Sequence, residues 1–216
     1  MRHIYIIDFD DTLFQTRVFW RKFLFPQYER IGIPFEVLEK VYIASTYKKF
    51  GYFIPPLFLR ELKKTCRKNG IKTRPTELKK IFEKTVYSNK ARSYFYPGAI
   101  NFLKQVRKSG NPRILLSSGD RGFKNKLFRS LGLGVFFPQF HITKKPKKDF
   151  IKKLRPEHPV ILVNDVLKET EDMVRELQKV SPKTRAFFVD YGNRFKLKDV
   201  KKPIALIHSL SEIKIL

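Results

Sequence analysis

The sequence contains little of what marks secreted proteins or proteins embedded in a membrane. Among its 216 residues there is one cysteine, Cys66. No intramolecular disulfide can therefore form, and we expect a reducing compartment. No apolar run approaches the ~20 residues that a transmembrane helix needs, and the N-terminus shows no signal-peptide architecture. The sequence predicts a cytoplasmic protein that does not enter the membrane.

Acidic residues are also scarce, since 20 Asp and Glu stand against 46 Lys and Arg and give a formal net charge of +26. Such a charge raises the potential of an anion-binding cleft and speeds the capture of anionic substrates. It also favours nonspecific attraction to nucleic acid at low salt. Hydrophobic residues make up 42% of the chain. Because highly charged disordered chains lack this apolar content, we expect a folded protein.

Five short apolar runs are typical of strands that are buried on both faces of a parallel sheet. The runs are residues 3–8, 113–117, 160–165, 185–190 and 203–208. Helical patterns lie between them, at 98–108, 148–154 and 172–180. The alternation of strands and helices predicts an α/β fold with a doubly wound parallel sheet.

Residues 16–96 contain no run of this kind and are typical of several amphipathic helices. They carry 19 Lys and Arg against 6 Asp and Glu, half of the excess positive charge of the chain. The segment follows the first predicted strand, and α/β sheets bind ligands at the carboxyl ends of their strands. We therefore expect a Rossmann-like core of residues 1–15 and 97–216 and an inserted helical cap of residues 16–96.

Three of the predicted strands end in a polar residue: Asp8, Ser117 and Asp165. The first of these stands in "IYIIDFDDTLF", where Asp10 follows two residues later. Carboxylates this close raise each other's pKa unless a cation or a reaction needs them. A lysine cluster, residues 144–148, precedes the third of these strands. Carboxylates, a hydroxyl and an ammonium at one sheet edge suit Mg²⁺ and a phosphoryl group.

These segments resemble the motifs of the haloacid dehalogenase superfamily, in its phosphatase branch. Four family motifs occur in order, and they are "IYIIDFDDT" (Asp8, Asp10, Thr12), "ILLSSG" (Ser117), "KKPKKDF" (best at Lys145) and "VILVND" (Asp165). The segment between the first two motifs has the position of the family's inserted cap. The tail, residues 201–216, resembles the family's last strand and closing helix.

The resemblance implies a Mg²⁺-dependent phosphatase. It assigns Asp8 as the nucleophile that forms an aspartyl-phosphate, and Asp10 as the general acid and then the general base. Mg²⁺ would be held by Asp8, Asp165 and the backbone carbonyl of Asp10. Ser117 and Lys145 would bind the phosphoryl oxygens. An acid at position 10 argues against the dehalogenase branch, in which the leaving group needs no proton.

Further residues join the predicted phosphate site with roles that the sequence leaves open. Thr12, Ser118 and Gly119 are expected beside the substrate. The choice among Lys144, Lys145 and Lys148 for the third motif stays open. Glu169 stands where many members carry a second acid, although it could equally cap or pair on the following helix.

We expect the substrate to be a small phosphorylated metabolite. The net charge suggests as an alternative a phosphatase for nucleotides or nucleic-acid ends, and only "YKKFGYF" (47–53) combines aromatic and basic residues as a base-stacking channel would. A second alternative is a non-catalytic protein of the same fold that binds a phosphorylated ligand. The intact pair of Asp8 and Asp10 counts against it.

Overall fold

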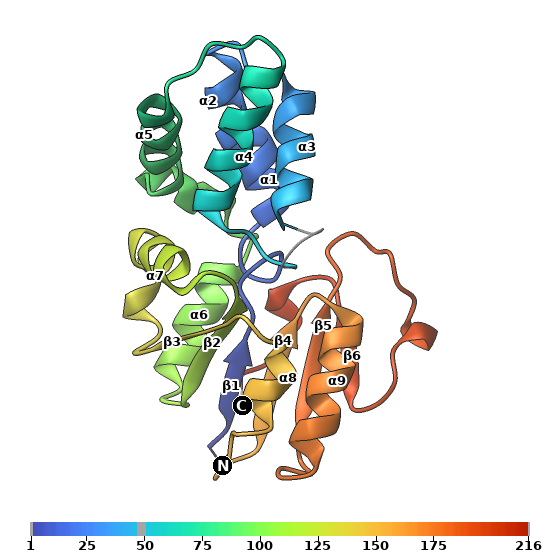
Figure 1. Cartoon of the computed structure of the whole chain (residues 1–216). Coiled ribbons are helices and arrows are strands. Elements are labelled where there is room, and N and C mark those ends of the chain that lie inside the picture. Colours follow the sequence, from blue (N-terminus) through green and yellow to red (C-terminus); the bar gives the residue numbers. More distant parts are fainter. Residues whose placement is uncertain (1, 47–50, 216) are drawn as a thin grey trace. The chain divides into compact units, whose positions relative to one another are not determined.

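A computed structural model of the chain describes residues 2–46 and 51–215, which form two compact units (Figure 1). The first unit, here called the sheet unit, consists of Met1–Gln15, Phe95–Ser118 and Gly134–Leu216. The second, the helical unit, consists of Thr16–Tyr94 and Gly119–Leu133. None of the described helices is both long and apolar enough to cross a membrane.

The sheet unit contains six parallel strands in the order β3-β2-β1-β4-β5-β6. They are β1 (Ile4–Ile7), β2 (Arg113–Ser118), β3 (Phe140–Thr143), β4 (Val160–Asn164), β5 (Arg185–Val189) and β6 (Ile204–Ile207). The chain first adds strands on one side of β1 and then on the other, so the order reverses between β1 and β4. Open α/β sheets bind their ligands at the carboxyl edge of such a switch point.

Helices cover both faces of this sheet. Successive side chains of β1 point to opposite faces. Ile6 packs in a core cluster with Ile151 of α8 (Lys147–Ile151) and Met173 of α9 (Leu167–Gln178). On the other face Tyr5 makes an edge-on ring contact with Phe102 of α6 (Ala99–Lys108), with 6.5 Å between the ring centroids. The doubly wound α/β fold predicted from the sequence is confirmed.

Two predicted features of this unit differ from the structure. β3 is not among the predicted strands, because "FHIT" is a short edge strand whose four residues are all only half buried. The prediction of a closing helix after the last strand was wrong. The chain there forms only a 3-10 turn, η5 (Leu210–Glu212), in which the Ser209 side chain accepts a hydrogen bond from the Ser211 N–H. The remaining short turns are η3 (Leu133–Val135) and η4 (Leu197–Asp199).

The helical unit is built around aromatic side chains. Its elements are α1 (Thr16–Phe19), the π-helix η1 (Trp20–Leu24), α2 (Phe25–Glu29), α3 (Phe35–Thr46), α4 (Pro55–Lys68), α5 (Pro75–Val86), η2 (Asn89–Tyr94) and α7 (Arg121–Ser130). Prolines in the first turns of α4 and α5 suit positions whose N–H groups have no partner in a helix. The ring centroids of Trp20 and Phe53 lie 4.6 Å apart, and the Phe53 ring contacts that of Phe123 of α7. These rings form the core of the unit.

The helical unit thus includes residues 119–133 in addition to the inserted segment. They belong to the segment 97–216 that is predicted from the sequence to form part of the core. Their ring contacts explain the difference, because Phe123 joins the aromatic cluster of residues 20, 53 and 82. The role of residues 16–96 as a cap stays a prediction.

The turn that follows β5 is fixed by a buried carboxylate. Asp190 is completely buried and accepts hydrogen bonds from the backbone N–H of Phe195, at 2.8 Å, and from Nε of Arg194, at 3.0 Å. Burial raises the pKa of Asp190, but these hydrogen bonds outweigh it and hold the pKa below its ordinary value. The ionised carboxylate therefore stabilises the folded state.

Replacing Asp190→Asn should lower the free energy of unfolding by about 1–2 kcal/mol at neutral pH, because charged hydrogen bonds are lost. Since the folded pKa is depressed, this contribution is present above the unfolded pKa and is lost as the pH falls through the folded pKa. Denaturant titrations of the wild type and the variant should show a constant difference in the free energy of unfolding at neutral and mildly acidic pH. This difference should become smaller below about pH 4. A difference that grows on acidification would contradict a depressed pKa of Asp190.

Candidate active site

The first predicted motif forms a tight turn directly after β1. The carbonyl of Phe9 accepts hydrogen bonds from the N–H groups of Leu13, at 3.0 Å, and Phe14, at 3.1 Å. Within the turn Asp11 adopts a left-handed backbone conformation, with φ of 51°. Asp is one of the few residues besides Gly that tolerates this region. The turn holds the side chains that follow Asp8 at the carboxyl edge of the sheet.

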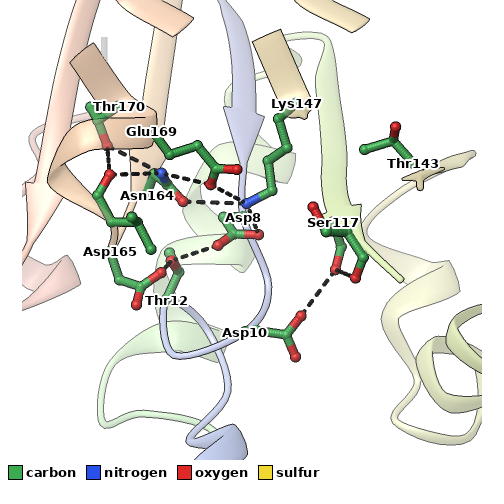
Figure 2. A network of polar contacts seen from close by, with 12 residues as sticks. Asp8, Asp10, Thr12, Ser117, Thr143, Lys147, Asn164, Asp165, Glu169 and Thr170 are labelled. Carbon is green, nitrogen blue, oxygen red and sulfur yellow. Dashed lines mark hydrogen bonds and ion pairs between the residues drawn. The ribbon is translucent and has the colours of Figure 1, made fainter. Parts of the chain in front are cut away.

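Two carboxylates converge on one hydroxyl at the switch point between β1 and β4 (Figure 2). Asp8 follows β1, and Asp165 follows β4. Oγ1 of the completely buried Thr12 lies 3.3 Å from Oδ2 of Asp8 and 3.1 Å from Oδ1 of Asp165. Because a hydroxyl carries a single hydrogen, it can satisfy only one of the two carboxylates at a time.

Lys147 supplies the cation of the site. Its side chain, only 5% exposed, places Nζ 2.7 Å from Oδ1 of Asp8 and 2.8 Å from Oε2 of Glu169. Nδ2 of Asn164 donates to the same Glu169 oxygen, at 3.2 Å, and to Oγ1 of Thr170, at 3.1 Å. Figure 2 shows this chain of contacts running from the α9 residues through the lysine to Asp8. The network fixes Lys147 between two carboxylates.

Burial controls the electrostatics of the cluster. It raises the pKa of Asp8 to about 6, with Lys147 acting against the shift and Glu169 and Asp10 adding to it. Burial, followed by the neighbouring charge of Asp8, raises the pKa of Asp165 well above its ordinary value. For Lys147 burial lowers the pKa, but Asp8 and Glu169 outweigh it, so the pKa is raised and the ammonium stays charged. Two carboxylates, those of Asp8 and Glu169, therefore share one buried cation, and Asp165 joins the cluster through the Thr12 hydroxyl.

Ser117 and Asp10 form the other side of the site. Ser117 lies near the end of β2 and is completely buried. Its Oγ lies 3.1 Å from Oδ2 of Asp10 and 3.4 Å from the carbonyl oxygen of Ser118. Figure 2 shows the Asp10 carboxylate turned toward Ser117, while the Asp8 and Asp165 carboxylates meet at Thr12. The structure thus separates the two carboxylates of the DxD motif by environment.

The donors at the switch point fit a hard divalent cation. In the part of the chain that the structure describes, no three His, Cys, Asp or Glu side chains form a group that could hold a metal ion by themselves. Asp8 and Asp165 can nevertheless supply two carboxylates, and Mg²⁺ usually takes one or two and completes its shell with water and substrate phosphate. Oδ1 of Asp8 is buried in its ion pair without an aligned hydrogen bond. The excess of buried negative charge favours a further cation.

The structure corrects the choice of the lysine. Lys145 is exposed, and its backbone N–H donates to Oγ1 of Thr143 at 3.0 Å in the turn before α8. Pro146 precedes the helix, so that Lys147 becomes its first residue and points inward. Lys148 lies 3.6 Å from Asp172 of α9. A run of lysines does not indicate which of its side chains faces the sheet. The residue at which α8 begins determines this.

The remaining predicted residues lie near the site along the chain. Ser118 ends β2 and is half buried, and Gly119 follows with φ of 153°. A Cβ at Gly119 would come within 3.0 Å of the Lys124 side chain. The roles of Ser118, Gly119 and Lys148 toward a substrate stay predictions. Asn164, the last residue of β4, was not among the predicted site residues, although its completely buried amide needs polar partners and finds them in Glu169 and Thr170 of α9.

A tyrosine pair supports the motif turn from outside. The hydroxyl of Tyr191 donates to the Thr12 carbonyl oxygen at 2.9 Å. Its ring stacks on Tyr96, with 3.6 Å between the centroids and 8° between the planes. Burial raises the pKa of the Tyr191 hydroxyl, with contributions from Tyr96 and Asp165, so this group remains a donor. Tyr191 is not among the predicted site residues, because no local sequence pattern links it to residues 8–12.

The chain is similar to known proteins in sequence and in fold. The family described as haloacid dehalogenase-like hydrolase matches residues 3–183. No curated protein matches the sequence at a significant level.

Several solved structures share the fold. A haloacid dehalogenase-like hydrolase from Burkholderia xenovorans is 15% identical, with a TM-score of 0.71 over 98% of this chain and 94% of its own. A magnesium-bound HAD-hydrolase from Bacillus subtilis is 12% identical, with a TM-score of 0.62 over 98% and 96%. The L-2-haloacid dehalogenase of Xanthobacter autotrophicus is 14% identical, with a TM-score of 0.60 over 98% and 96%.

The Tyr191→Phe variant should keep the stacked ring and lack only the hydroxyl that donates to the Thr12 carbonyl oxygen. We expect the free energy of unfolding to fall by about 1 kcal/mol, since a carbonyl loses its hydrogen bond. Denaturant unfolding at neutral pH measures this loss. An unchanged free energy would show that the hydroxyl does not hold the turn.

Proposed function

This chain belongs to the haloacid dehalogenase-like hydrolase family, and we propose that within it the chain is a Mg²⁺-dependent phosphomonoesterase. Its substrate would be a small phosphorylated metabolite, and its reaction would proceed through an aspartyl-phosphate at Asp8. The observation that carries the proposal is the pair of differently placed carboxylates, Asp8 in the charged cluster and Asp10 on the Ser117 hydroxyl.

Asp8 is suited to nucleophilic attack. Oδ1 faces the Lys147 ammonium and Oδ2 faces the Thr12 hydroxyl, which together favour the ionised form that attacks phosphorus. Attack forms the bond from Asp8 oxygen to phosphorus while the bond from phosphorus to the ester oxygen breaks. Lys147 and the Ser117 hydroxyl are then positioned to stabilise the negative charge of the phosphoryl oxygens.

Asp10 is suited to proton transfer. It lies two residues beyond the nucleophile, and its Oδ2 lies 3.1 Å from the Ser117 hydroxyl. An ester oxygen leaves as an alcohol only if it receives a proton, and the protonated Asp10 can supply it. The resulting carboxylate can then take a proton from the water that hydrolyses the aspartyl-phosphate. A halide needs no such proton, which is why this residue favours a phosphate ester over a haloacid.

Asp8 and Asp165 would hold Mg²⁺, as expected for a hard cation with oxygen ligands. When bound, the ion neutralises the phosphoryl group and lowers the pKa of both carboxylates. The magnesium-bound relative from Bacillus subtilis supports this choice of metal. The backbone carbonyl of Asp10 remains our proposed third protein ligand.

The test of this function compares Asp8→Asn and Asp10→Asn on two substrates that differ in leaving group. Asp8→Asn should abolish Mg²⁺-dependent release of phosphate from both, because no phosphoenzyme can form. Asp10→Asn should lower kcat/KM by about 10²–10⁴ for glycerol phosphate, whose alcohol needs a proton. The loss should be far smaller for para-nitrophenyl phosphate, whose leaving group departs as a stable anion.

Equal losses on both substrates would contradict the acid role of Asp10. Release of halide from 2-chloropropionate, without release of phosphate from any ester, would contradict the phosphatase proposal itself. Chelation of Mg²⁺ with EDTA should remove the activity, and added Mg²⁺ should restore it.

A second comparison tests the assignment of the lysine. Lys147→Gln removes the buried ammonium, and we expect kcat/KM to fall by about 10²–10³, as for other groups that stabilise transition-state charge. Lys145→Gln changes the net charge by the same amount on the exposed side of the turn and should leave kcat/KM within about twofold. A larger loss from Lys145→Gln than from Lys147→Gln would reverse the assignment.

A further inference from the structure

Two adjoining grooves cross the surface of the helical unit. The first, of about 790 Å³, is bordered by Arg30 of the segment after α2 and by Lys80 and Lys84 of α5. The second, of about 590 Å³, is bordered by Lys63 of α4 and by the loop that joins α4 to α5. Arg74, which precedes α5, and Glu77 line both grooves, so the two adjoin.

The pair of grooves, here called the basic double groove, concentrates positive charge. Its lining includes seven exposed cationic side chains against the single carboxylate of Glu77, and the seven are Arg30, Lys63, Arg67, Lys72, Arg74, Lys80 and Lys84. Among the described residues, none of the seven forms an ion pair with a carboxylate. On α9, by contrast, Lys168 and Arg175 both pair with Asp172. The positive charge of the groove is thus uncompensated.

The spread of these charges fits a polyanion. Arg74 and Lys84 are ten residues apart along α5, or about 15 Å at the rise of an α-helix. A nucleic-acid duplex carries about nine phosphate charges over that length. A single phosphate would need only one or two of the seven cations. A flat membrane surface fits a concave site poorly, and none of the exposed large apolar side chains (Ile43, Val135, Val166, Val180 and Leu197) lines the groove.

The lining also distinguishes between forms of nucleic acid. Neither groove is lined by an aromatic side chain. Proteins that bind single strands combine basic grooves with aromatic rings on which the bases stack. A duplex keeps its bases stacked inside and offers its phosphates outward. The aromatic and basic stretch 47–53, which suggested a base-stacking channel, has its residues 47–50 outside the described part of the chain.

We propose that the basic double groove binds the phosphate backbone of double-stranded nucleic acid without reading its sequence. This is a binding activity of the helical unit and does not depend on catalysis at Asp8. It assigns a ligand to the uncompensated charge that the sequence concentrates in residues 16–96.

The experiment measures binding of a fluorescently labelled duplex of about 20 base pairs by anisotropy, in EDTA so that no turnover interferes. The groove variant is Lys63→Glu/Arg74→Glu/Lys80→Glu. Its matched control, Lys153→Glu/Lys183→Glu/Lys201→Glu, reverses three exposed lysines of the sheet unit. Each variant reverses three charges and so lowers the formal net charge by six, from +26 to +20.

We expect the groove variant to bind the duplex at least about tenfold more weakly at low salt, with the slope of log K against log salt reduced by roughly 2.7, or 0.9 for each lost phosphate contact. The control should lose about threefold or less, with the slope unchanged within about 0.5. Equal losses in the two variants would overturn the proposal, because net charge alone would then explain binding. Tighter binding of a single strand of the same length, or of phosphatidylserine vesicles, would overturn it as well.

Thermal unfolding followed by circular dichroism checks that both variants fold. If the triple charge reversal does not fold, Arg74→Gln/Lys80→Gln removes two charges without introducing new ones. The proposal then requires a slope reduction of roughly 1.8. An unchanged slope in this variant would contradict it.

Discussion

The ion pair between Lys147 and Asp8 is the interaction on which the rest of the site depends. A carboxylate buried at the end of a central strand is costly unless a cation accompanies it. Lys147 provides that cation, but it is shared with Glu169, and Asp165 brings a third carboxylate to the same place. One cation therefore faces three carboxyl groups. This incomplete neutralisation supports the proposal that the site binds a metal ion.

The parallel sheet creates this arrangement from segments that are distant in sequence. Register places Ile7 beside Val163 on β4, so the next residues of both strands emerge at one edge. Lys147 reaches that edge as the first residue of α8. Glu169 reaches it from α9 and is held there by the Asn164 amide. The turn directs the Asp10 carboxylate toward β2, where it contacts the Ser117 hydroxyl. One short motif thus places its two carboxylates against different partners.

Much of this could be predicted from the sequence, and the failures share a cause. Apolar runs identify buried strands such as β1 and β4, and polar residues at their ends identify Asp8 and Asp165, because both signals are local. The edge strand β3 has only half-buried residues and gives no such signal. The choice of Lys147 depends on where α8 begins, and the contact of Tyr191 with Thr12 depends on tertiary packing. Neither of these two features can be predicted from a local sequence pattern.

We propose that Asp8 and Asp165 together hold a divalent cation beside Lys147. The most direct measurement is a crystal grown with Mn²⁺ in place of Mg²⁺ and recorded at the manganese absorption edge. We expect one strong anomalous peak at about 2.0–2.2 Å from a carboxylate oxygen of each aspartate. Absence of a peak between the two, or a peak bound to only one of them, would contradict it.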